Sequence, residues 1–275
     1  MSAETGVRPP VRSRTRKAAD TFSAYLRLDA IEEAMFPLGN AFRYVALIAP
    51  VFTYYFQAEF LGARALYTST LVGISTAAGM QFALTGFTVR LQWAQERGTL
   101  ESYLVEPVSW RLIPLAMNVW PSLIGLLITC AMLSTGWLLG AEINVSGLPM
   151  FLVVLALGLA ACNAVGVLSA SYLVLFKRGE PILAAYGLAA SLLGGALFSI
   201  DVLPWWLRWM SYLVPHAYAI GAERALLAPG TPNGGISVRL AVVVLVVFSV
   251  AGLWLGLRAF AAALQYARRL GILSS

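Results

Sequence analysis

Long runs without a charged side chain constrain this sequence more than any other feature. Segments such as Leu112–Ala141 and Ile143–Phe176 contain no Asp, Glu, Lys or Arg. The chain is 59% hydrophobic and 12% charged, whereas about a quarter of the residues in a soluble domain are charged. A bilayer core about 30 Å thick requires about 20 apolar residues of helix, since a helix satisfies its own backbone groups in lipid. The sequence therefore predicts an all-α integral membrane protein.

Six apolar stretches are long enough, or nearly long enough, to cross the bilayer as helices. In chain order they are Ala41–Phe60, Ala65–Val89, Leu112–Ala141, Ile143–Phe176, Pro181–Ile200 and Leu240–Leu257. The third and fourth exceed the length of a span, so each is expected to include loop residues. The last is short, but Ser237 and Val238 extend it if the Arg239 side chain reaches back to the interface. An even number of spans places both termini on the same side.

The distribution of Lys and Arg predicts which side that is, because these residues are retained on the cytoplasmic face during insertion. With cytoplasmic termini, 14 of the 19 basic residues lie inside and 4 lie outside, while Arg43 lies at the inner edge of the first span. The inside set is Arg8, Arg12, Arg14, Arg16, Lys17, Arg27, Arg90, Arg97, Arg111, Lys177, Arg178, Arg258, Arg268 and Arg269, and the outside set is Arg64, Arg208, Arg224 and Arg239. We therefore expect a multi-pass protein of the plasma (inner) membrane with both termini cytoplasmic. The net charge of +6 then reflects orientation and anionic lipid rather than nucleic acid.

The N-terminal segment Met1–Ala19 is rich in Arg, Ser and Pro and poor in apolar residues, which predicts a disordered basic cytoplasmic tail. Residues 20–275 then form a single transmembrane domain. Its first element is predicted to be a helix on the inner membrane surface that begins at Asp20 or Thr21 and ends at Pro37. Its apolar positions recur every three or four residues, at Phe22, Tyr25, Leu28, Ile31 and Met35.

A charged interruption separates the second and third spans. It reads Glu96-Arg97-Gly98-Thr99-Leu100-Glu101 and is followed by Glu106-Pro107. From Leu91 to Glu106 apolar and polar positions recur with helical spacing, so we expect a short amphipathic helix parallel to the membrane. Because short connections join it to two spans, such a helix can act as a lever when its charged and aromatic side chains hold a soluble partner. The alternative is a solvated loop whose charges serve only to keep it on the cytoplasmic side of the membrane.

An aromatic segment, Asp201–His216, precedes the last span and is too short to cross the bilayer. It contains three tryptophans and has a proline near each end. Because indole favours the headgroup boundary, short helices that dip into the outer leaflet and return are expected, with an anchoring outer loop as the alternative. His216 has no neighbouring carboxylate or thiol in the sequence and is expected to face solvent or headgroups.

Several chemical motifs are missing from the sequence. It contains no G-x-x-x-x-G-K-[ST] phosphate loop, so any ATP hydrolysis must occur on another polypeptide. It contains no H-E-x-x-H motif, and Cys130 and Cys162 are expected to be small buried hydrophobes. The span interiors hold almost no ionisable side chains, which disfavours ion-driven transport. Close helix packing is expected at Gly73, Gly79, Gly158, Gly166, Gly194 and Gly195.

Together these features resemble the membrane subunits of ATP-binding-cassette exporters of the type-2 permease superfamily, which includes drug, polysaccharide and lipid exporters. The resemblance rests on the Glu96–Glu101 stretch with Pro107 shortly after it, on the interfacial helix and six spans, and on the Pro204–Pro215 outer segment. In that family the stretch after the second span forms a cytoplasmic coupling helix that docks on the ATPase. The resemblance implies that role here for Trp93, Glu96, Arg97, Gly98, Thr99, Leu100 and Glu101.

The resemblance also implies partners and an activity. Two separate ABC ATPase subunits, which carry ATP and Mg, would drive two permease chains that are identical or homologous. This chain would then be a transport subunit without catalytic, cofactor or metal sites of its own. Cargo would move at the interface between the permeases, and the candidates for lining that route are Phe52, Tyr55, Phe82 and Phe198. The lack of buried charge favours a lipophilic or amphiphilic cargo, such as a drug, a lipid or a lipid-linked glycan.

Two other functional classes stay open on the residues alone. A polytopic membrane enzyme acting on lipid-linked substrates would need clustered acids at a membrane face, and Glu96, Glu101 and Glu106 form the closest such group between spans. Their helical spacing does not converge them on one metal. A non-catalytic membrane scaffold predicts no dependence on an ATPase, so a neighbouring gene for a phosphate-loop protein would favour the exporter over both alternatives.

Overall fold

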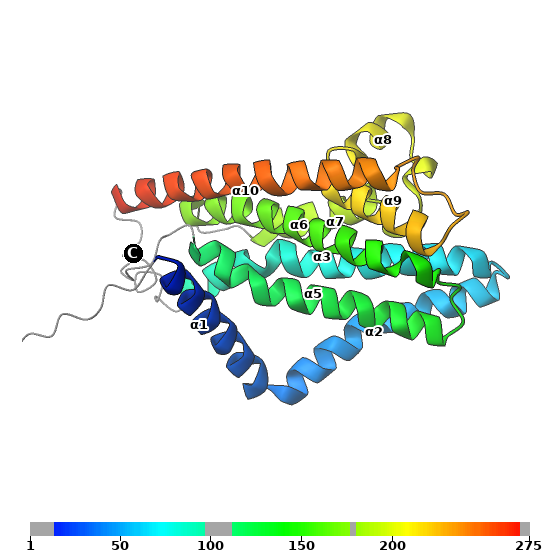
Figure 1. The fold of residues 1–275 in the computed structure, drawn as a ribbon, viewed down its shortest axis with the longest axis horizontal. Coiled ribbons are helices and arrows are strands. Elements are labelled where there is room, and N and C mark those ends of the chain that lie inside the picture. Colours follow the sequence, from blue (N-terminus) through cyan, green and yellow to red (C-terminus); the bar gives the residue numbers. More distant parts are fainter. Residues whose placement is uncertain (1–13, 97–111, 177–179, 270–275) are drawn as a thin grey trace, which may run out of the picture.

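The computed structural model describes residues 14–96, 112–176 and 180–269, and every regular element in these ranges is helical. The long helices lie side by side in one elongated bundle (Figure 1). The start of α1 and the end of α10 lie at the same end of this bundle, as an even number of crossings requires. We call it the Glu96 end, and the opposite end the Arg64 end, after the two termini of α3.

The helices are α1 (Arg14–Met35), α2 (Pro37–Phe60), α3 (Arg64–Glu96), α5 (Leu112–Leu138), α6 (Leu148–Phe176), α7 (Glu180–Leu193), α8 (Trp205–Ser211), α9 (Pro215–Leu227) and α10 (Val238–Arg269). Two short 3-10 turns, η1 (Val145–Gly147) and η2 (Ile200–Val202), precede α6 and α8. The small helices α8 and α9 sit at the Arg64 end (Figure 1). The predictions of an all-α fold and of membrane-spanning helices are confirmed.

The six spans that the sequence predicts are not confirmed as such. Within the described residues, α3, α5, α6 and α10 are each long and apolar enough to cross a membrane, and a fifth span results if α1 and α2 count as one bent pair. The predicted fifth span, Pro181–Ile200, is wrong in its extent, because α7 ends at Leu193. Its 14 residues rise only about 21 Å. The chain turns at Gly195, whose φ of +79° lies in the left-handed region that glycine adopts readily.

A sharp bend separates α1 from α2. The two helix axes differ by 92° at Phe36, where the following Pro37 disfavours helical geometry and then opens α2 as one of its first residues. The pair forms a V beside the bundle (Figure 1). A helix is therefore present where the interfacial helix is predicted, but it begins at Arg14, earlier than the predicted start at Asp20 or Thr21 and within the segment expected to be a disordered tail.

Helix α3 is longer than the span predicted from Ala65 to Val89. It continues without a break to Glu96, so the prediction that a separate membrane-parallel helix begins at Leu91 is wrong over residues 91–96. The reason is packing, because Leu91 and Ala94 are buried in the same cluster as Phe87 and Tyr25. The remainder of the predicted helix lies outside the described residues.

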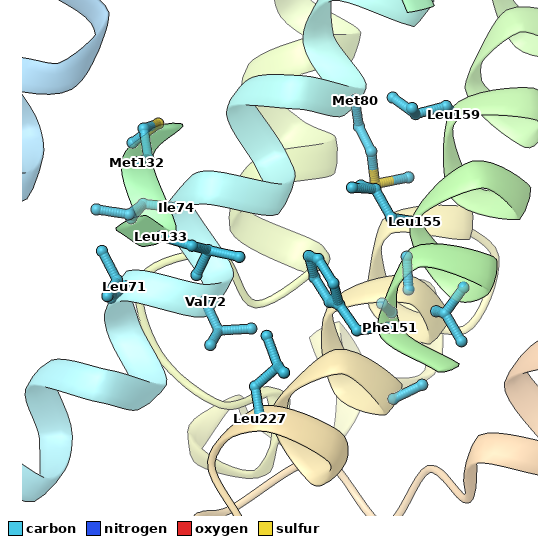
Figure 2. Packing of buried hydrophobic residues seen from close by; sticks show 14 of the residues in the cluster. Leu71, Val72, Ile74, Met80, Met132, Leu133, Phe151, Leu155, Leu159 and Leu227 are labelled. Carbon is cyan, nitrogen blue, oxygen red and sulfur yellow. The ribbon is translucent and has the colours of Figure 1, made fainter. Parts of the chain in front are cut away.

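The main hydrophobic core fills the space between α3, α5, α6 and α9. Ten of its side chains are labelled in Figure 2, and they come from α3 (Leu71, Val72, Ile74, Met80), α5 (Met132, Leu133), α6 (Phe151, Leu155, Leu159) and α9 (Leu227). Helix α3 is central, since it packs against α5, α6, α9 and α2. Displacing α3 would therefore disturb most of the bundle.

Close backbone contact between α3 and α5 depends on two glycines. A Cβ placed on Gly125 would lie 2.4 Å from the Gly79 carbonyl oxygen, and one placed on Gly79 would lie 2.7 Å from the Gly125 carbonyl oxygen. Thr129 strengthens the crossing by donating hydrogen bonds to the Ser75 and Gly125 carbonyls, at 3.1 and 2.9 Å. The prediction that Gly79 permits close helix packing is confirmed.

Candidate functional site

The predicted partner-binding segment is carried by the last turn of α3. Trp93 is 48% exposed at the Glu96 end, and Glu96 is also exposed and accepts a 3.1 Å hydrogen bond from Gln92 Nε2. An exposed tryptophan beside a carboxylate suits a protein contact, because aromatic side chains anchor interfaces. The other predicted coupling residues, Arg97, Gly98, Thr99, Leu100 and Glu101, lie outside the described residues.

A shielded ion pair joins α1 to this end of α3. The Arg90 guanidinium donates to both oxygens of Asp29, with Nη1–Oδ2 and Nη2–Oδ1 distances of 2.9 and 2.8 Å. The exposed fractions of the two side chains are 19% for Arg90 and 3% for Asp29. Paired contacts of this kind combine charge with fixed geometry. A movement of the Glu96 end of α3 would therefore be transmitted to α1.

We expect Asp29→Ala to lower the free energy of unfolding by about 3 kcal/mol, because it leaves the partly buried Arg90 charge without its partner. The unfolding midpoint of the purified chain should fall by about 6–12 °C. The matched control is Glu59→Ala, which breaks the equally bidentate but exposed pair with Arg64 and should leave the midpoint unchanged. The double exchange Asp29→Arg with Arg90→Asp should restore part of the loss, and equal midpoints for Asp29→Ala and Glu59→Ala would contradict a structural role for the pair.

The four aromatic residues predicted to line a transport route lie in different surroundings. Phe52 on α2 is 44% exposed and Phe198, after α7, is 39% exposed. Tyr55 instead packs edge-on against Tyr67 of α3, with ring centroids 5.6 Å apart, and Phe82 packs against the main core. Their role in lining a route stays a prediction.

Helix α2 has a largely uncovered face. Only Val51 and Ala58 of its 24 residues are buried, whereas Phe56 and Phe60 are 65% and 90% exposed. Two polar residues one helical turn apart, Thr53 and Gln57, are also exposed. Lipid is a poor environment for an amide side chain, so this mixed face suits contact with protein or water better than contact with acyl chains.

Helix α9 carries ionisable side chains into the bundle. Ten of its residues are buried, and Glu223 among them is fully buried. Its Oε2 accepts a hydrogen bond from Thr76 Oγ1 of α3, while its Oε1 has no partner among the described residues. Thr76 lies about 18 Å along α3 from the Arg64 end, at 1.5 Å of rise per residue. A carboxyl group is thus placed well inside the helix bundle.

Arg224 stabilises the irregular chain that follows α7. Its guanidinium donates to three carbonyl oxygens, with Nε–O of Ser69 at 3.0 Å, Nη2–O of Ala196 at 3.2 Å and Nη1–O of Phe198 at 3.4 Å. The carbonyls at 196 and 198 belong to a segment without regular helical bonding. A single buried side chain, 2% exposed, therefore ties α9, α3 and the end of α7 together.

The expectation that His216 faces solvent or headgroups is wrong. His216 is 0% exposed, and Cys162 Sγ of α6 lies 3.9 Å from both of its ring nitrogens. The cause is close packing at the start of α9, where the His216 Cβ would lie 2.4 Å from a Cβ placed on Gly194. The absence of a side chain at Gly194 leaves the room that the imidazole uses.

The sequence-based topology places Arg224 outside the membrane and does not predict that the charges of α9 are buried. The sequence does carry a signal, since the small residues Ala217, Ala219, Gly221 and Ala222 precede the charged pair within one short helix. A helix of this composition has no wide polar face on which a charge could be solvated. Such a pattern predicts buried charges with polar partners elsewhere in the chain.

The aromatic segment at the Arg64 end protrudes from the bundle. Trp205, Trp206 and Trp209 of α8 are 82%, 52% and 55% exposed, and α8 lies at the periphery in Figure 1. Asp201 fixes the chain just before α8, because it pairs with Arg208 and accepts a 2.8 Å hydrogen bond from the Gly234 backbone amide. Although partial burial opposes it, hydrogen bonding and the Arg208 charge lower the pKa of the Asp201 carboxyl below its ordinary value. The segment therefore exposes its three indole rings on a helix whose preceding residues are held in place.

Comparison with known proteins places this arrangement in a family. The family model described as the ABC-2 type transporter matches residues 34–228, which begin at the end of α1 and extend through α9. The match covers more than half of the chain. A comparison with curated proteins finds no match. With several helices able to span a membrane and a family match over most of its length, the chain belongs to the ABC-2 type transporter family and is a membrane-spanning subunit of an ABC transporter.

Proposed function

We propose that this chain is the permease half of an ATP-driven exporter. Two permease chains, identical or homologous, would assemble with two ATPase subunits that bind ATP and Mg. The Glu96 end of the bundle would face the cytoplasm, which agrees with the excess of Lys and Arg predicted on that side. Helices α2 and α7, together with the elements that follow them, would complete the six crossings. The cargo would be a lipophilic or amphiphilic molecule.

One observation carries this proposal. Helix α3 runs unbroken for 33 residues and presents Trp93 and Glu96 at its exposed end, where Asp29 and Arg90 brace it against α1. A helix is stiff along its axis, so a force applied by a soluble partner at this end would reach the centre of the bundle. The coupling residues Arg97 to Glu101, directly after α3 in the sequence, would complete the contact.

The coupling role is tested by reversing charge at the predicted contact. Glu96→Lys with Glu101→Lys should leave membrane insertion unchanged but reduce capture of the ATPase subunit by at least about tenfold, because each lost charged contact costs more than about 1 kcal/mol. The measurement is a mild-detergent pull-down of the tagged chain, followed by mass spectrometry and an ATPase assay. Glu142→Lys, a reversal at an exposed residue whose backbone amide bonds to Thr68 near the Arg64 end of α3, is the matched control. If the double variant captured the ATPase subunit and supported ATP hydrolysis as well as the unsubstituted chain, the coupling role would be wrong.

The exposed face of α2 supports a second permease as the neighbour. Thr53 and Gln57 lie on this face beside Phe56 and Phe60, and pairing two copies would remove both polar side chains from lipid. Gln57→Cys in a Cys130→Ser background should therefore give a disulfide-linked dimer in native membranes. Leu255→Cys on the lipid-facing side of α10, where Leu255 is 52% exposed, should not. Equal cross-linking at both positions would argue against an α2 interface.

A further inference from the structure

A cavity of about 370 Å³ opens between α5, α6 and α10. It arises because α5 packs chiefly against α3 whereas α10 packs chiefly against α6, so the two outer helices diverge. Ala156 and Ala160 lie one turn apart on α6, and their small side chains leave space above this helix. None of the four predicted route residues lines this space. The cavity is thus separate from the route proposed for the cargo.

Three polar side chains gather in the wall of this otherwise apolar cavity. Asn163 Nδ2 of α6 donates to Ser122 Oγ of α5 at 2.8 Å, and Ser122 Oγ donates to the Asn118 carbonyl at 2.7 Å. Within the part of the chain that the structure describes, the side-chain oxygens of Asn118 and Asn163 have no hydrogen-bond partner. Asn118 is only 5% exposed. Two amide acceptors are therefore held at the edge of a cavity within the membrane bundle, where lipid tails supply no donor.

The lining defines the chemistry of a ligand. Among the described residues, those that line the cavity carry no charge, which disfavours an ionic headgroup. Leu115, Leu126 and Leu253 present an apolar surface, and the volume lies in the range of small-molecule sites. The torsion that orients an asparagine amide is soft and roughly two-fold, so Asn118 can turn its oxygen towards an entering donor. A hydroxyl group both donates and accepts, and so complements an amide.

We propose that this cavity binds one uncharged, hydroxyl-bearing amphiphile from the bilayer, with its hydroxyl at Asn118 and Asn163 and its apolar body along α5 and α10. The proposal does not depend on coupling to an ATPase. The hydroxyl could belong to a resident membrane lipid or to a passing cargo molecule, since both would offer the same chemistry. The two sources differ in how readily the molecule exchanges.

The test uses the full chain in native membranes and a photoreactive probe, a long-chain primary alcohol bearing a diazirine. Its O-methyl ether is the matched probe, since it keeps the chain but cannot donate a hydrogen bond. The alcohol should label peptides containing Leu115–Leu126 or Leu253 at least fivefold more than the ether does. Ala160→Trp, which fills the cavity, should abolish this labelling. Leu152→Trp, on the same helix but outside the cavity, should retain it.

Further variants distinguish the effect of the hydrogen bond from the effect of the cavity's shape. Asn163→Leu should reduce labelling by the alcohol to the level of the ether, and Ser122→Ala offers a second variant if the first fails to fold. Equal labelling by the two probes in the unsubstituted chain both before and after lipid extraction, as expected for a cavity that holds only water, would overturn the proposal. So would labelling that persists in Ala160→Trp, or cross-linking to a second protein chain in place of labelling.

Extraction of the purified protein distinguishes the sources. A hydroxyl-bearing lipid that co-purifies at one molecule per chain, and whose removal is needed before the probe labels the cavity, identifies a resident lipid. Immediate labelling without prior extraction identifies an exchanging molecule, as expected for cargo. Both outcomes support the site. Failure of the alcohol to label the cavity peptides even after extraction would overturn it.

Discussion

Gly125→Ala is expected to lower the free energy of unfolding by about 3 kcal/mol, the upper end of the usual cost of overpacking. The added methyl group would lie 2.4 Å from the Gly79 carbonyl oxygen, which belongs to helix backbone and cannot move alone. Relief requires α3 and α5 to separate, and their separation would also strain the Thr129 hydrogen bonds. The measurement is the unfolding midpoint of the purified chain, monitored as the loss of its monodisperse chromatographic peak on heating.

Gly39 provides the matched control for this substitution. It is also a helical glycine, but a Cβ placed on it would have no neighbour within 4 Å. Gly39→Ala should be neutral or stabilising by up to about 1 kcal/mol, because alanine favours a helix over glycine. Equal midpoints for Gly125→Ala and the unsubstituted chain would mean that the α3–α5 crossing is looser than the structure indicates.

Arg224→Met should have an effect of similar size, with a loss of about 3 kcal/mol or more. The change removes the charged donor shared by the Ser69, Ala196 and Phe198 carbonyls, and each hydrogen bond to a charged group is worth about 1.5–3 kcal/mol. The chain between α7 and α8 would lose its attachment to α9. We therefore expect a lower unfolding midpoint together with faster limited proteolysis between residues 194 and 203.

Two further variants make this test specific. Arg224→Lys keeps the charge but cannot present three donors in one plane, so it should recover only part of the stability. Arg239→Met removes an exposed charge and should change neither the midpoint nor the proteolysis. If Arg224→Met unfolded at a lower temperature without faster cleavage after α7, its role would be confined to the packing of α9.

The sequence predicts the spanning helices well where the absence of charge decides the outcome. Helices α5, α6 and α10 fall within or around the runs that contain no charged residue, since such a run has no stable place outside lipid or a core. The prediction fails for α7, because a turn at Gly195 ends an equally apolar run. Composition cannot distinguish a long helix from a short helix followed by a buried turn.

The candidate sites were less predictable because their partners are remote in the sequence. Thr76 lies 147 residues from Glu223, and Ser69 lies 155 residues from Arg224. No local pattern reports such pairings. The end of α3 was easier to identify, because Trp93 and Glu96 lie next to a charged interruption that the sequence displays directly.

The burial of His216, Glu223 and Arg224 along α9 has a consequence for how the protein is made. A helix with these side chains would not partition into lipid by itself, so the insertion machinery cannot release it sideways as it releases an apolar span. Its ionisable side chains contact α3, α6 and the chain after α7, all of which emerge from the ribosome earlier, and α10, which emerges later, packs against it afterwards. Docking of α9 must therefore follow the assembly of those helices, which makes the order of synthesis along the chain also an order of tertiary assembly.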